Sequence, residues 1–210
     1  GLNDMLGANG TLSYNLNQTD TLTASATYHG RTKDQRGTDV YANGATALIP
    51  ASDYTRSTVR NGDSKNYSWG GRYDHKGELP GETLKIDLRV SSSDNDNDSN
   101  YVNDYATPGR ADTRAFQHSD TTIKVVDFTG DYERPLWGGS AKAGYKAART
   151  TSTFDTLYTD IDPLTSVAIV NPARSNRFEV DETVFALYGS YQMRLSENWG
   201  ALAGLRTEYT

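Results

Sequence analysis

The sequence alternates between apolar and polar residues most regularly in the stretch 65–93. A β-strand places successive side chains on opposite faces, so this pattern predicts strands with one apolar and one polar face. In the second half of the stretch the apolar positions are Leu84, Ile86, Leu88 and Val90, and the polar ones are Lys85, Asp87, Arg89 and Ser91. Turn residues at 77–82 separate this half from a first half that alternates around Trp69. We therefore predict a hairpin whose arms are each about the 9–11 residues that a tilted strand needs to cross a bilayer.

Three further hairpins follow the same pattern, at 11–28, 121–151 and 183–209. The polar stretches between hairpins predict long loops at 29–64, 94–120 and 152–182. Structureless loops beyond about 12–15 residues are uncommon in compact domains, whereas outer-membrane barrels have short turns at one rim and long loops at the other. The predicted fold class is therefore all-β, an antiparallel up-and-down meander of long strands that forms a segment of a transmembrane β-barrel.

In such a barrel the apolar faces of the strands meet lipid and the polar faces line the interior. The interior residues would include Lys85, Asp87, Arg89, Lys142, Lys146, Gln192, Arg194, Arg206 and Glu208. Alternation alone fits a soluble sheet with one solvated face equally well. The aromatic residues favour the barrel, because they lie near the predicted strand ends, as an interfacial girdle requires. These residues are Tyr28, Tyr67, Tyr73, Tyr132, Trp199 and Tyr209.

Composition narrows the class of protein further. The chain has 210 residues, a formal net charge of −6 and a pI of about 5.0, which argues against a nucleic-acid surface as partner. Its mean hydropathy is −0.71 and it contains no run of about 18 apolar residues, so no transmembrane helix is expected. Cysteine is absent, which excludes disulfides, zinc–thiolate sites and a cysteine nucleophile.

Three stretches resemble TonB-dependent outer-membrane receptors, in particular their outer membrane beta-barrel family branch. Residues 95–109 and 171–182 resemble extracellular loops of that family, and residues 203–210 are similar to one of its recurrent barrel strands. The resemblance implies a bacterial outer-membrane location and a barrel of about 22 strands around a plug. It further implies uptake of a siderophore, vitamin or glycan, driven through the TonB complex.

No plug and no TonB-interaction box is recognisable in this sequence. The resemblance therefore implies that residues 1–210 form one partial outer-membrane β-barrel domain, an interior segment of about eight strands. The implied partners are outer-membrane lipid, an extracellular small-molecule or glycan ligand, and the plug domain and TonB complex through other parts of the protein. No nucleic acid is expected among the partners.

The sequence contains no pattern that predicts an enzyme, a cofactor or a metal site. Asp94, Asp96 and Asp98 have the spacing that begins a calcium loop, but Ser99 and Tyr105 replace the glycine and glutamate that an EF-hand needs. The three histidines lie far apart in the sequence, without the spacing of metal ligands or of a catalytic triad. We therefore expect no catalytic residues, no cofactor and no metal.

Ligand contacts are expected in the three predicted long loops. Exposed tyrosine and arginine dominate binding surfaces, so the candidate ligand-binding residues are Arg56, Arg60, Tyr101, Tyr105, Arg174 and Arg177. The function that the sequence favours is a receptor or transporter barrel of the bacterial outer membrane. Two alternatives stay open: a soluble all-β binding or adhesion module, and a small structural outer-membrane barrel that closes on itself.

Overall fold

The computed structural model describes residues 2–42 and 53–210, which form nine β-strands in one antiparallel sheet. The strands are β1 (Asn3–Asn15), β2 (Asp20–Tyr41), β3 (Tyr54–Lys76), β4 (Thr83–Tyr105), β5 (Thr113–Leu136), β6 (Gly139–Ile161), β7 (Ala168–Val170), β8 (Asn176–Arg194) and β9 (Gly200–Tyr209). Within these residues no helix is long and apolar enough to span a membrane. The predicted all-β fold class is confirmed.

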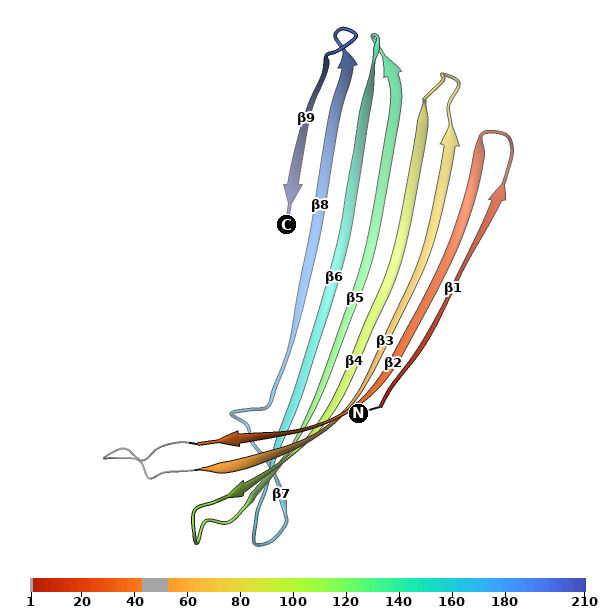
Figure 1. The fold of residues 1–210 in the computed structure, drawn as a ribbon. Coiled ribbons are helices and arrows are strands. Elements are labelled where there is room, and N and C mark those ends of the chain that lie inside the picture. The colour runs from red at the N-terminus through yellow and green to blue at the C-terminus, as the bar shows by residue number, and fades with distance from the viewer. Residues whose placement is uncertain (1, 43–52) are drawn as a thin grey trace.

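Each long strand pairs with its neighbour in the sequence, in the order β1-β2-β3-β4-β5-β6-β8-β9 (Figure 1). The short strand β7 folds back onto the end of β6. The sheet is therefore the predicted up-and-down meander. The register between neighbours runs unbroken from β1 to β9, so every second residue of a strand lies on the same face along its whole length.

Short turns join the strands at one end of the sheet, at 16–19, 77–82, 137–138 and 195–199. The turn between β5 and β6 has only two residues, and both Trp137 and Gly138 have positive φ angles, of 47° and 76°. Such a turn matches the twist of the strands that it joins. The connections at the opposite end include 106–112 and 162–175, and the second of these is longer than any of the short turns.

The long loops predicted at 29–64, 94–120 and 152–182 are largely strand, and this part of the prediction was wrong. β2 and β3 continue to Tyr41 and from Tyr54, and residues 43–52 of the first predicted loop lie outside the described residues. In these extensions polar residues occupy both faces of the sheet, so the apolar and polar alternation that reveals a strand disappears. The backbone hydrogen bonds between neighbouring strands do not need apolar side chains, and the ladders therefore continue.

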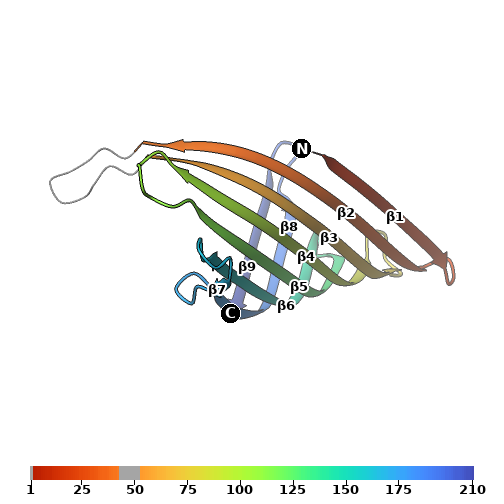
Figure 2. The same cartoon turned by 90° about the horizontal axis from the view of Figure 1, so that it is seen from below.

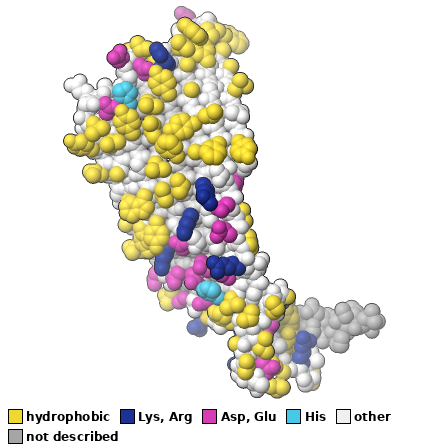
Figure 3. Space-filling view, turned by 180° about the vertical axis from the view of Figure 1, so that it is seen from behind, with side chains coloured by type: hydrophobic (Ala, Val, Ile, Leu, Met, Phe, Trp, Pro, Cys, Tyr) yellow, Lys and Arg dark blue, Asp and Glu magenta, His cyan; other side chains and the backbone are white. Residues whose placement is uncertain are grey.

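The sheet is a single curved layer, and no second layer of the described residues covers either face (Figure 2). Among hydrophobic residues only Ala115 and Ala186 are buried within the described chain, whereas Trp69 is 66% exposed and Leu187 is 62% exposed. Figure 3 shows that the hydrophobic side chains gather on the outer, convex face, in the part of the sheet near the short turns. A soluble sandwich would instead bury such a face against a second sheet.

This exposed surface, which we call the apolar band, ends at a definite position on each long strand. The last apolar outward residues before the polar extensions are Tyr28, Tyr67, Val90, Val126, Ala147 and Phe185. The rings of Tyr28 and Tyr67 lie side by side at this border, with their centroids 5.4 Å apart. Tyrosine suits such a border because its ring is apolar and its hydroxyl is polar.

We expect that a charge within the apolar band destabilises the protein strongly when lipid covers this face. Leu88 lies on the outer face of β4 between Gly71 and Phe128, and Leu88→Arg should lower the free energy of unfolding in lipid vesicles by about 2–4 kcal/mol. Ser91→Arg, on the inner face of the same strand, should cost less than about 1 kcal/mol. Urea titration in vesicles measures both, and equal losses would show that lipid does not cover the outer face.

Candidate functional site

The inner face of the sheet carries charged residues at the level of the apolar band. Arg72 on β3 lies directly opposite Asp87 on β4, and Arg89 on β4 lies opposite Asp127 on β5. Opposite charges that face each other across neighbouring strands stabilise a sheet. The ion pair recorded for Arg72 is with Asp74 on its own strand, with Nη2 and Oδ1 2.8 Å apart. The predicted placement of Lys85, Asp87 and Arg89 on the inner face fits this register.

Ion pairs extend this arrangement to β6. The ammonium Nζ of Lys146 lies 3.5 Å from Asp127 Oδ2, and that of Lys142 lies 3.4 Å from Asp131 Oδ1. All four side chains are partly exposed, so each pair is worth little on its own. Together they make an inner wall in which positive and negative charges lie close to each other on neighbouring strands. Such a polar wall suits a water-filled interior.

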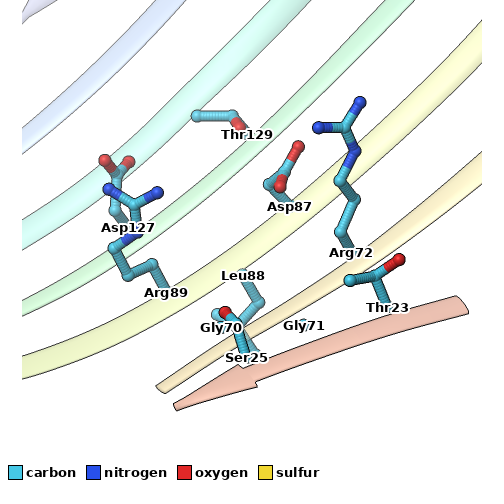
Figure 4. A pocket seen from close by; sticks show the side chains of 10 residues that line it. All are labelled: Thr23, Ser25, Gly70, Gly71, Arg72, Asp87, Leu88, Arg89, Asp127 and Thr129. Carbon is cyan, nitrogen blue, oxygen red and sulfur yellow. The ribbon is translucent and has the colours of Figure 1, made fainter. Parts of the chain in front are cut away.

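A hollow of about 430 Å³ opens in this wall (Figure 4). Arg72 and Asp87 line one part and Arg89 and Asp127 another, with small and hydroxyl-bearing residues between them. Gly70 helps to create the space, because a Cβ atom at this position would lie 2.6 Å from Ser25 Oγ. The hollow offers both guanidinium donors and carboxylate acceptors to a polar group that enters the interior.

A second inner-face feature lies at the opposite end of the sheet from the short turns. The guanidinium carbon of Arg56 lies 5.4 Å from the ring centroid of Tyr41, 5.7 Å from that of Tyr54 and 5.6 Å from that of Tyr101. Distances within about 6 Å allow cation–π attraction. Arg56 Nε also donates a hydrogen bond of 2.8 Å to Asn103 Oδ1, which fixes the plane of the guanidinium.

Tyrosine rings continue this feature in two directions. Tyr54 stacks on Tyr41 with centroids 4.6 Å apart and tilts against Tyr105 at 5.2 Å. Towards β6, Tyr101 stacks with Tyr158 at 6.3 Å. These two tyrosines approach each other across β5, where the buried Ala115 faces Tyr101 and its small side chain leaves room.

Two further arginines cover the outer members of this row. Arg174 lies over the ring of Tyr158, with its guanidinium carbon 4.7 Å from the centroid, and Arg110 lies 3.8 Å from that of Tyr105. We call the whole set the Tyr/Arg surface. It consists of Tyr41, Tyr54, Arg56, Tyr101, Tyr105, Arg110, Tyr158 and Arg174.

The structure thus brings together four of the six residues that the sequence suggested for ligand binding: Arg56, Tyr101, Tyr105 and Arg174. Arg60 lies on the same face of β3, where its Nε donates to Ser99 Oγ at 3.2 Å, but it makes no recorded contact with the Tyr/Arg rings. Arg177 does not belong to the group. It lies on the outer face of β8 and pairs with Asp155 on β6, with Nε and Oδ2 3.7 Å apart. Binding of a ligand by any of the six stays a prediction.

Sequence reasoning missed Tyr41, Tyr54, Tyr158 and Arg110. The signal for the first two is the register, because Tyr41, Tyr54 and Tyr105 form one cross-strand row once β2, β3 and β4 extend to the end of the sheet. Reading these stretches as loops removed that information. Arg110 lies in the connection between β4 and β5, and Tyr158 lies near the end of β6. Neither stretch has a distinctive pattern in the sequence.

On the outer face, one group of described residues has the atoms that a metal ion could bind. It consists of Asp96, Asp98 and His118, whose ligand atoms lie within 4.8 Å of one another. The geometry already suits a charge pair: His118 Nδ1 lies 2.8 Å from Asp98 Oδ1 and 3.6 Å from Asp96 Oδ1. The hydrogen bond to Asp98 and the negative charge of Asp96 raise the pKa of His118 above its ordinary value. The expectation of no metal site stays untested.

Comparison with known proteins connects these features to a family. Residues 75–210, more than half of the chain, match the outer membrane protein beta-barrel family. The chain belongs to this family. A search of curated proteins found no match.

Family membership places the protein in the bacterial outer membrane and gives the sheet a direction. In such barrels the short turns face the periplasm and the opposite end faces the cell exterior. The apolar band therefore meets lipid, the charged wall faces the barrel interior, and the Tyr/Arg surface lies at the extracellular end of that interior. Both polar features lie on the inner face, where water and solutes have access.

The pairing of His118 predicts a pH dependence that NMR can measure. Because the pKa of His118 is raised in the folded protein, its ion pair stabilises the fold at low pH, and this contribution is lost as the pH rises through the raised pKa. Asp98→Asn should lower the pKa of His118, whereas Asp181→Asn, on the outer face of β8, should leave it unchanged. A His118 titration that is the same in all three proteins would contradict the assigned pairing.

Proposed function

We propose that the chain forms part of the wall of an outer-membrane receptor that takes up an extracellular ligand in a TonB-dependent manner. The ligand would be a small molecule such as a siderophore or vitamin, or a glycan. The observation that carries this proposal is the Tyr/Arg surface, which places aromatic rings and guanidinium groups at the extracellular end of the inner face. In this proposal the protein acts as a transporter and not as an enzyme.

The composition of the Tyr/Arg surface supports a role in capture. Tyrosine and arginine are the residues most enriched at binding hot spots, because they offer large contact areas together with hydrogen-bond donors. Arg56 is held in place by Asn103, whose own Nδ2 donates to Thr113 Oγ1 at 2.9 Å. A site whose side chains are fixed before binding loses less conformational entropy when the ligand arrives.

The charged inner wall supports a role in passage. A ligand that moves from the Tyr/Arg surface towards the periplasm would pass the hollow between Arg72, Asp87, Arg89 and Asp127, which lies farther along β3. In the proposed receptor a plug domain fills the interior and contacts the same wall, and the TonB complex acts on that plug. The resemblance of residues 95–109 and 171–182 to loops of TonB-dependent receptors is the sequence observation that favours energised uptake over a passive pore.

Ligand binding by the Tyr/Arg surface can be tested with the full-length protein in detergent micelles. The probes are a ferric siderophore, cobalamin and a neutral oligosaccharide, each measured by calorimetry. We expect one probe to bind, and the double variant Arg56→Ala with Tyr101→Ala to weaken its binding at least about tenfold, since two hot-spot side chains are removed. Arg177→Ala removes an arginine at the same end of the sheet, on the outer face, and should leave the affinity unchanged.

Whether transport requires energy is tested separately, by measuring the uptake into cells of the probe that binds. Collapse of the proton gradient should stop accumulation if TonB drives transport. Continued entry at the same rate would instead identify a passive barrel, including the small self-closing barrel. Equal affinity of the double variant and the wild type would refute the Tyr/Arg surface as the capture site, whatever the energy source.

A further inference from the structure

The outer face carries an ordered sequence of charges just beyond the apolar band. The first outward residues past the band are Gly30, Lys65, Ser92, Lys124, Arg149 and Thr183, on β2, β3, β4, β5, β6 and β8. Half of them are cationic and none is acidic. We call Lys65, Lys124 and Arg149 the basic row.

At the next two outward positions on the same strands, every charged residue is acidic. They contain Asp34, Asp63, Asp94, Asp96, Asp120, Asp181 and Glu179, and no lysine or arginine. Figure 3 shows positive side chains bordering the hydrophobic area, with negative side chains gathered farther from it. Over these three outward positions the charge thus changes sign with distance from the apolar band.

The basic row is available to an external anion. Lys65 and Lys124 are exposed, and within residues 2–42 and 53–210 the structure records no ion pair for either ammonium group. Arg149 is the exception, since its Nη2 lies 3.2 Å from Asp181 Oδ2. Two of the three cations therefore have no recorded ion pair, although Lys65 lies opposite Asp94 in the register and the chain as a whole is acidic.

We propose that the basic row binds the phosphate groups of phosphorylated lipids in the outer leaflet. The row lies at the extracellular border of the lipid-covered surface, where the headgroups of that leaflet begin. Lysine and arginine at such a border keep their stems against acyl chains and extend their charged ends to the headgroups. Each cation near an anionic lipid surface contributes about 1 kcal/mol to the attraction.

The acidic positions farther out make the interaction depend on depth. A phosphate beside Lys65 or Lys124 is attracted, whereas one placed farther out along these strands faces acidic residues such as Asp63 and Asp120 and is repelled. The protein is therefore held at one height relative to the headgroups. This inference concerns the outer face and does not depend on the ligand proposed for the inner face.

The test uses full-length protein in neutral detergent and fluorescently labelled lipid A, a phosphorylated glycolipid, whose binding is followed by anisotropy. Lys65→Gln with Lys124→Gln should weaken binding roughly 30-fold, since each cation accounts for about a fivefold change in affinity. The control pair, Lys33→Gln with Lys76→Gln, removes the same charge from the inner face and from the short-turn end, and should bind like the wild type. Lys65→Arg with Lys124→Arg should retain binding. That result would show that lipid A binding requires positive charge at these positions.

Three results would overturn the proposal. The first is equal affinity of the Gln pair and the control pair. The second is equally tight binding of dephosphorylated lipid A, which would show that the acyl chains alone are recognised. The third is displacement of lipid A by inorganic phosphate at the same concentration, which would identify an ion site instead of a lipid site.

Discussion

The structure depends on one constraint: a single-layered sheet has an apolar face that no other part of the described chain covers. Burying a leucine or phenylalanine side chain stabilises a protein by about 1.5–3 kcal/mol. A soluble domain gains this stabilisation by packing two layers of secondary structure together. Among residues 2–42 and 53–210, only Ala115 and Ala186 are buried hydrophobic residues. The apolar band must therefore gain its stabilisation from lipid, and the alternation of side chains along each strand follows from having lipid on one face and water on the other.

The same constraint explains the inner face. Backbone groups within a bilayer must be hydrogen-bonded inside the protein, and the unbroken register from β1 to β9 provides these bonds between neighbouring strands. The strands can then carry charges towards the interior, provided that opposite charges face each other, as Arg89 and Asp127 do. Beyond the apolar band both faces are wet, so the side chains there are free to serve binding. The Tyr/Arg surface lies in that region.

How far the sequence predicts this structure depends on where the two faces differ in polarity. Around Leu84, Ile86 and Leu88 one face is lipid-covered and the other wet, so the alternation is visible and predicts strands on both sides of the turn at 77–82. The strand before this turn extends beyond the predicted bounds, back to Tyr54. Beyond Val90 the alternation vanishes because both faces are polar, yet the strand continues to Tyr105. The predicted loops were too long for this reason. These stretches are strands because their backbones pair with neighbouring strands, and a hydropathy pattern does not reveal that pairing.

The candidate site was predictable in part, for a related reason. Arg56, Tyr101 and Tyr105 were chosen as tyrosine and arginine in predicted loops, and they lie together although the structure places all three on strands. Their assembly with Tyr41 and Tyr54 needed the register of three strands, which no local pattern contains. Arg177 shows the opposite error, since treating it as a loop residue hid the fact that it is an even number of positions from Phe185 and thus shares its outward face.

Strand parity also separates the two surfaces that we propose. On β3, Arg56 and Arg72 face inward and Lys65 faces outward, so one strand contributes to the proposed capture surface, to the interior wall and to the proposed lipid contact. The rigid ladder keeps these roles apart, because a side chain on one face cannot reach the other without breaking backbone hydrogen bonds. Substitutions at odd and even positions of β3 therefore act on different partners, and combining them should give additive effects. A single sheet in a membrane can thus carry two independent recognition surfaces without a second layer.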